Sequence, residues 1–395
     1  MASVTGHLTR NVIVLAVAGV VGGVAVLLGG LVSPHRALVA WLAAFASVTS
    51  LAIGALVLYL IGYAANARWL AVVRRAHEVI IGVFPILLVL FAPIALGVAD
   101  LYPWADPDAR WTEHEARMLE AKRAWLEPLG FAVRGFLYLG VCTVAAEVLR
   151  RRSRRRDGAG EASAVDPEAT LATDRAIACG LLPLVGLAIT FAGFDWIMSL
   201  DPTWASSMFG VYYFAGGFVA GIAALAIVAA WLARRARDIV TPHHFHAIGR
   251  LLFAFTVFWA YAAYFQAFLI QIADRPAEVT FYLARLDGGW TGWTLALAIG
   301  HFVVPFALLL PRRVKYRAGW VAGVAGWILA MHYADLYWLV APSAGSLSPH
   351  WLDLAALVAV VGLSGAWCLW RQRGVPAFAV GDPFLAEGIA YRSPT

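Results

Sequence analysis

Ten long apolar runs, each of about the length that crosses a bilayer as a helix, dominate the pattern of this chain. A membrane-spanning helix requires about 20 predominantly apolar residues. The predicted spans are 11–31, 37–61, 79–99, 129–148, 177–197, 209–232, 251–272, 290–310, 319–339 and 352–370. The runs are unbroken and lack the alternation of barrel strands. We therefore predict an all-α polytopic membrane protein that forms one integral membrane domain over residues 1–395.

Basic residues gather in the loops that follow the even-numbered spans. They lie at 68–75, 150–156, 234–237, 312–317 and 371–373. With ten spans, all five clusters fall on one side of the membrane. The positive-inside rule makes that side cytoplasmic. Both termini are therefore predicted to be cytoplasmic, and one missed helix would scatter the clusters.

Three segments between or after the spans have a distinct composition. Residues 150–170 are rich in Arg, Gly and Ala and predict a flexible cytoplasmic loop. Residues 100–127, predicted to be periplasmic, carry three Trp among acids and bases. This pattern fits a short interfacial helix, a partner contact or headgroup anchoring by Trp. Residues 371–395 are predicted to form a cytoplasmic tail.

Composition excludes several classes of protein. The chain is 62% hydrophobic and only 14% charged, whereas globular chains are about 25% charged. Its net charge of +6 lies in short loops, so we expect no nucleic-acid binding. Cys142, Cys179 and Cys368 lie in apolar runs without a C-x-x-C pattern, which argues against c-type haem, iron–sulfur clusters and zinc. His301 and His332 lie at different predicted depths, which argues against a b-type haem.

The informative residues are the polar ones that fall within or next to apolar spans. On the outer half lie Asp195, Asp201, Gln266, His332 and Asp335; near the middle lies His301; at the inner mouth lie His77, Glu78 and Arg250. Carboxylates and His in spans mark proton relays and ion paths. They could equally form polar walls around a quinone headgroup, with Asp195, His332 and Asp335 as its partners.

Structural explanations compete at several of these sites. Glu147, next to the Arg150 cluster, fits an ion pair near the membrane surface. His77 and Glu78 fit helix-end capping, and a neutral His301 bonded to a neighbouring helix is as plausible as a functional one. Asp201, in Leu-Asp-Pro, fits a turn before the sixth span. The glycines at 216, 217 and 221 are expected to permit close helix packing.

A set of motifs from the fifth span onward resembles a known family, the ActF membrane subunit of bacterial alternative complex III. The motifs occupy 194–202, 207–212, 258–261, 265–266, 288–290, 301–306, 335–340 with Pro342, and 381–383. The resemblance is weak in the first four spans. Thr203 departs from the pattern, since the family often has His after Asp-Pro, and this leaves open any proton role that needs an imidazole there.

The resemblance implies an NrfD-like fold of two four-helix bundles flanked by two helices, in a bacterial inner-membrane complex that oxidises menaquinol or ubiquinol. It implies a non-catalytic subunit without cofactors that supplies proton half-channels. It also implies partners: an ActC-like quinol-binding membrane subunit, an iron–sulfur protein and a multihaem cytochrome c that hold the clusters and haems, and a cytochrome or terminal oxidase as acceptor. Three alternatives remain open: a quinone-binding subunit, an ion or solute transporter, and a purely structural scaffold.

Overall fold

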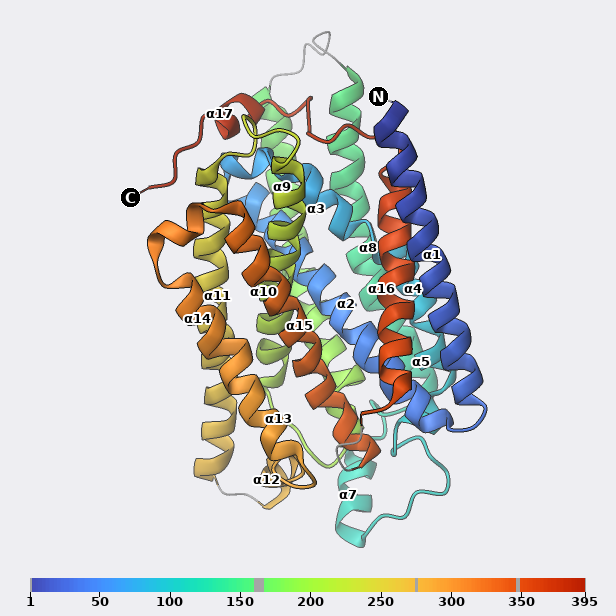
Figure 1. The fold of residues 1–395 in the computed structure, drawn as a ribbon. Helices are drawn as coiled ribbons and strands as arrows, with labels where there is room; N and C mark the ends of the chain where they lie inside the picture. Colours follow the sequence, from blue (N-terminus) through green and yellow to red (C-terminus); the bar gives the residue numbers. More distant parts are fainter. Residues whose placement is uncertain (1, 160–166, 274–275, 346–348, 395) are drawn as a thin grey trace.

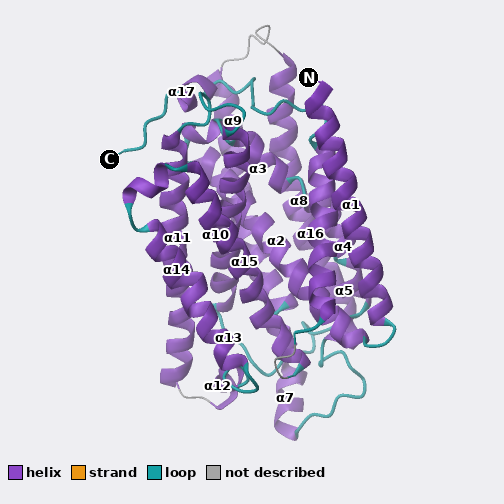
Figure 2. Cartoon of the chain, viewed as in Figure 1, coloured by secondary structure: helices purple, strands orange, loops and turns teal. Residues whose placement is uncertain are grey.

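The computed structural model describes residues 2–159, 167–273, 276–345 and 349–394, and every regular element in these ranges is a helix (Figures 1 and 2). Within these ranges, ten helices are long and apolar enough to cross a membrane, which confirms the predicted number of spans. In chain order they are α1 (Ala2–Gly30), α2 (Pro34–Ala64), α3 to α5 (Arg74–Leu96), α8 (Pro128–Ala159), α9 (Pro167–Trp196), α10 (Phe209–Ala233), α11 (Pro242–Ala273), α13 to α14 (Trp290–Leu309), α15 (Ala318–Val340) and α16 (Trp351–Arg371).

The spans divide into two four-helix groups and a flanking pair. In the first group, α2, the broken span from α3 to α5, α8 and α9 pack together. In the second, α10, α11, the span from α13 to α14, and α15 pack together. The pair is α1 and α16, which lie side by side along the edge of the molecule and contact the rest mainly through α2 (Figure 1). Both termini lie on one face of the bundle, called here the termini face (Figure 1).

Helix α2 forms the centre of the molecule, because it packs on both groups and is buried along most of its length. Its closest partner is α10, and glycines allow the approach. A Cβ built on Gly54 would lie 2.1 Å from the carbonyl oxygen of Gly217, and a Cβ on Gly221 would lie 2.4 Å from the backbone nitrogen of Ala55. Small residues of this kind let helix backbones touch in membranes. The predicted packing role of Gly217 and Gly221 is confirmed.

Two spans are interrupted where proline removes a backbone donor. The third span consists of α3 (Arg74–Ile81), α4 (Phe84–Leu90) and α5 (Ala92–Leu96), with Pro85 and Pro93 in the first turns of the last two. The eighth span consists of α13 (Trp290–Leu297), a π-helical turn η4 (Ala298–Val303) and α14 (Val304–Leu309), with Pro305 in the first turn of α14. Single π-helical turns occur often at functional sites.

The prediction of a flexible loop at 150–170 is wrong for its described ends. Helix α8 continues to Ala159 and α9 begins at Pro167, while 160–166 lie outside the described residues. Three of the arginines in this segment are held by acids of the bundle. Arg150 is 2% exposed and donates to Glu147, and Arg152 and Arg156 both pair with Asp174.

The remaining segments form short helices. Within 100–127, α7 (Glu113–Lys122) is an exposed helix with a capping box between Thr112 and Glu115, so a short helix is present there as expected. Short helices also occur at η1 (Arg68–Ala71), α6 (Val98–Leu101), η3 (Met198–Leu200), α12 (Pro276–Leu283), η5 (Arg312–Tyr316), η6 (Ala341–Ala344) and α17 (Leu385–Ile389). The C-terminal segment crosses the termini face, where α17 packs on η1.

Candidate functional site

A polar cluster lies where the two four-helix groups meet, and Asp335 of α15 is at its centre. Asp335 is 2% exposed. One oxygen accepts a hydrogen bond from the Tyr212 hydroxyl of α10, and the other accepts from Trp259 Nε1 of α11 at 3.2 Å. Two neighbouring helices therefore hold this carboxylate, with a donor on each of its oxygens. We call this group and the two histidines described next the central cluster.

The two deep histidines join Asp335. His332 Nε2 lies 3.0 Å from the Ser50 hydroxyl and 3.3 Å from the Ser47 carbonyl oxygen, both of α2. His301 lies in the π-helical turn, with its ring centroid 3.9 Å from that of Trp259. Within the described part of the chain, Nδ1 of His332 and both ring nitrogens of His301 have no hydrogen-bond partner. These nitrogens leave the cluster with proton-binding capacity.

Gly216 of α10 leaves open the space around which this cluster is arranged. A Cβ at this position would lie 3.5 Å from His332 Nδ1, 3.5 Å from Trp259 Cδ1 and 3.6 Å from Asp335 Oδ2. The histidine nitrogen and the carboxylate therefore face one point, although they lie on successive turns of α15. The imidazole and the carboxylate thus border the same small space beside α10.

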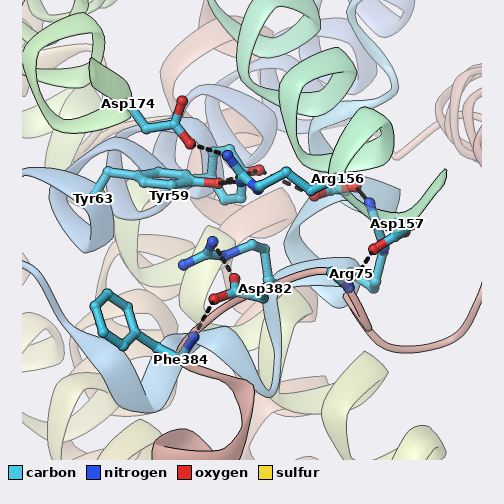
Figure 3. A network of polar contacts seen from close by, with 11 residues as sticks. Tyr59, Tyr63, Arg75, Arg156, Asp157, Asp174, Asp382 and Phe384 are labelled. Carbon is cyan, nitrogen blue, oxygen red and sulfur yellow. Dashed lines mark hydrogen bonds and ion pairs between the residues drawn. The ribbon is translucent and has the colours of Figure 1, made fainter. Parts of the chain in front are cut away.

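A second buried polar group, the termini-face cluster, lies between α2, α3 and the ends of α8 and α9 (Figure 3). Glu78 of α3 is fully buried, pairs with Arg75 and accepts from the Tyr59 hydroxyl at 3.1 Å. Arg75 also pairs with Asp157. Tyr63 lies one turn from Tyr59, with 3.5 Å between their hydroxyl oxygens.

The termini-face cluster is closed by arginine pairs from distant parts of the chain. Arg156 donates to the Tyr63 hydroxyl at 3.3 Å and pairs with Asp174 at the start of α9 (Figure 3). Arg74 pairs with Asp382 of the C-terminal segment. The cluster is therefore rich in balanced charge, in contrast to the central cluster with its single carboxylate.

The helical seam between α2 and α10 separates the two clusters. Ser50 and Tyr59 lie nine positions apart on α2, about 13 Å along a helix. Between them, Gly54 and Ala55 pack against the backbone of Gly217 and Gly221. Backbone contact at this distance leaves no room for water along this helix pair.

The residues predicted at the inner mouth differ in burial and in their contacts. Glu78 belongs to the termini-face cluster, and His77 is buried beside it with its ring centroid 5.8 Å from that of Tyr59. Glu78 is thus part of a buried ion pair rather than only a helix-end charge. Arg250 is exposed on α11 and is not part of the termini-face cluster, so its place at an inner mouth stays a prediction. Glu147 pairs with Arg150 and with Arg371, at 2.6 and 2.7 Å, as the ion-pair explanation expected.

Asp195 is buried near the opposite face but is not part of the central cluster. Its carboxylate accepts from Arg134 Nε at 2.8 Å, from Trp125 Nε1 at 2.6 Å and from the Tyr138 hydroxyl at 2.8 Å. Its hydrogen bonds go to α8 and the segment before it, whereas those of Asp335 go to α10 and α11. The three residues expected around a quinone headgroup therefore share no hydrogen-bond partner.

Two further outer residues have local partners. Asp201 accepts from the backbone and hydroxyl of Thr203, at 3.2 and 2.7 Å, which is the turn role expected of it. Gln266 of α11 is buried and donates to the Tyr282 hydroxyl of α12 at 3.1 Å. Neither side chain bonds to the central cluster.

Arg285, which follows α12, is a buried cation that the sequence analysis did not single out. It donates to the carbonyl oxygens of Trp338 and Leu339 in the last turn of α15, at 3.2 and 2.7 Å. Burial lowers the pKa of its guanidinium to about 9. The favourable interaction of a cation with a helix C-terminus offsets part of the free-energy cost of burying the charge. Arg285 thereby fixes the end of the helix that carries Asp335.

Tyr212 and Trp259 of the central cluster, and Tyr59, Arg75, Asp157 and Asp174 of the termini-face cluster, were also not predicted as site residues. Tyr59 and Tyr63 have a signal in the sequence, since two tyrosines four positions apart share one helix face. Asp157 and Asp174 have no such signal, because both lie in or next to a charged segment between predicted spans, where acidic residues are common.

The described side chains offer proton donors and acceptors rather than a metal site, since no three His, Cys, Asp or Glu of the described ranges come together to hold an ion. Among known proteins, no family model and no curated sequence matches the chain.

Proposed function

We propose that this chain is an ActF-like membrane subunit of a quinol-oxidising respiratory complex, where it binds no cofactor and carries protons. The central cluster is the proton-exchanging group of one half-channel, and the termini-face cluster belongs to the other. The ActC-like partner binds menaquinol or ubiquinol, and the iron–sulfur and multihaem cytochrome subunits pass the electrons on.

The observation that carries the proposal is the buried Asp335 beside two histidines with free ring nitrogens. A carboxylate inside a membrane bundle is costly, and such residues typically mark proton relays. Its two donors come from aromatic side chains that satisfy it without fixing its charge through an ion pair. A carboxylate held in this way can alternate between its charged and neutral forms.

The family resemblance receives support from where its motifs meet. Tyr212, Trp259, His301 and Asp335 belong to four separate motifs in the sequence, yet they converge in one cluster. Motifs that only stabilised individual helices would have no reason to converge. The five basic clusters support a cytoplasmic termini face, which gives the termini-face cluster the role of the cytoplasmic half-channel in a bacterial inner membrane.

The seam between the clusters implies that protons do not pass freely. The packed backbones near Gly54 and Gly217 separate the two half-channels along α2. Transfer between them requires a rearrangement of α2 against α10, or passage through the partner subunit. A seam of this kind prevents leakage of protons when no quinol is oxidised.

The test is Asp335→Asn in the assembled complex, compared with Asp335→Glu and with Asp238→Asn at an exposed position. Quinol oxidation and proton release are measured together in proteoliposomes. We expect Asp335→Asn to lower proton release per quinol, Asp335→Glu to restore part of it, and Asp238→Asn to behave as wild type. Wild-type values of both rates in Asp335→Asn would remove the relay role. The scaffold alternative would be favoured if the Asp335 variants lowered the amount of assembled complex, while the complex that did assemble still coupled proton release to quinol oxidation.

A further inference from the structure

A cavity of about 320 Å³ opens at the termini face between the end of α2, η1 and α9. Three arginines line it: Arg68, Arg74 and Arg175. Its size falls at the lower end of the range of small-molecule pockets, about 300–1,000 Å³. It lies apart from the central cluster, while Tyr63 and Arg74 of the termini-face cluster form part of its wall.

Within the described ranges, the acids of the chain do not balance the charge of the cavity. Arg68 pairs with Glu387 at 2.5 Å, and Arg74 pairs with Asp382. Arg175 is exposed, and over the described ranges it has no carboxylate within ion-pair distance. The neighbouring acid on α9, Asp174, points to Arg152 and Arg156 instead. One positive charge is thus left in a pocket built from arginines.

The wall formed by α9 continues from the cavity into the membrane as an exposed apolar stripe. Ala172, Ala176 and Cys179 line the cavity and are exposed. Beyond Cys179 the helix exposes further apolar side chains, Leu184 and Leu187, which are 50% and 55% exposed. All five residues lie within the membrane span Ala169–Leu200. A ligand that fills both parts has an anionic head and an apolar tail.

We propose that this cavity binds the headgroup of an anionic phospholipid, with the phosphodiester at Arg175 and an acyl chain along α9. Arginine offers a planar set of donors that matches phosphate oxygens. Basic pockets between membrane helices on the cytoplasmic side are typical sites for anionic headgroups. The single excess charge of the cavity matches the single charge of a phosphodiester.

The chain contains its own reporter, because Cys179 lies in the cavity wall and is exposed. In a Cys142→Ala, Cys368→Ala background, Cys179 is the only thiol. The full chain is placed in nanodiscs of phosphatidylcholine alone or with phosphatidylglycerol, and alkylation by N-ethylmaleimide is timed. We expect alkylation to be about fivefold slower with phosphatidylglycerol, roughly the contribution of one arginine near an anionic lipid. Arg175→Gln should remove the difference and Arg175→Lys should retain part of it.

Two controls separate the headgroup from general effects of lipid composition. Val144→Cys, in a background without Cys179, places a thiol on the exposed face of α8, where Val144 is 58% exposed; its alkylation should not depend on the lipid. Arg151→Gln removes an arginine that is 75% exposed and outside the cavity, and should leave protection of Cys179 intact.

Equal alkylation of Cys179 in the two lipids would overturn the proposal. Equal slowing at Val144→Cys would also overturn it, because the effect would then come from the membrane surface. A third arm uses the protein in detergent with inorganic phosphate. Protection by phosphate alone as strong as that by phosphatidylglycerol would make the cavity a site for free anions and not for lipid.

Discussion

The contact between α2 and α10 leads to the most specific prediction for stability, and Gly54→Ala is the change that tests it. The added Cβ would lie 2.1 Å from the carbonyl oxygen of Gly217 and 2.4 Å from its carbonyl carbon, whereas ordinary contact begins at 3.4 Å. The obstructing atoms belong to a backbone and cannot rotate away. The helices must therefore separate by about 1 Å at the centre of the molecule.

The expected cost follows from this overlap. Overpacking of a buried site typically costs 1–3 kcal/mol where side chains can adjust. Since backbone meets backbone here, we expect the loss in stability to reach or exceed about 3 kcal/mol. Gly140→Ala on α8 is the matched control, because its Cβ would meet nothing within 4 Å. Alanine favours a helix over glycine by up to about 1 kcal/mol, so the control should be neutral or slightly more stable.

The assay is thermal unfolding of both variants in the same detergent, followed by size-exclusion chromatography and tryptophan fluorescence. Gly54→Ala should melt several degrees below wild type or fail to yield a monodisperse protein, while Gly140→Ala should melt at or above wild type. Identical melting of Gly54→Ala and wild type would refute the close packing of α2 on α10, and with it the seam between the clusters.

Three further outcomes follow from the buried charges. Glu78→Gln should destabilise the protein by about 3 kcal/mol, because it weakens a buried pair with Arg75; unchanged unfolding in denaturant would contradict this. Asp195→Asn should lower the melting temperature and increase the accessibility of the tryptophan that donates to it, measured by iodide quenching; unchanged quenching would show that the bond is not formed. Asp382→Asn should free the C-terminal segment from Arg74 and speed its removal by a protease; equal cleavage rates would show that the ion pair does not hold this segment.

The fold was largely predictable from the sequence because a bilayer imposes a strong constraint. Every backbone polar group of a span has to be satisfied within the membrane, so a run of about 20 apolar residues implies a helix. The glycines of α10 were identified as packing residues for a related reason, since lipid-embedded helices associate through small residues. Deep polar residues such as Asp335 and His332 were conspicuous against the same background.

The termini-face cluster was less predictable because its charges lie at the ends of spans. Arg75 and Asp157 follow or precede apolar runs, and that position is typical of water-exposed loop residues. Only the fold shows that α8 extends beyond the apolar run and that the C-terminal segment returns over α3. Arg75 and Asp157 are 82 positions apart, and no periodic pattern in the sequence indicates that two such distant residues pair. The separation of Asp195 from Asp335 was also not predictable, because it depends on how distant helices pack.

Purification of the tagged chain from native membranes in a mild detergent tests the proposed function most directly. The co-purified polypeptides are identified by mass spectrometry, and the haem absorption of the complex is recorded before and after addition of a quinol. We predict a multihaem cytochrome and an iron–sulfur protein in fixed proportion to this chain, with haem reduction by quinol. A chain that purifies alone or only with copies of itself, without haem absorption, would contradict the account.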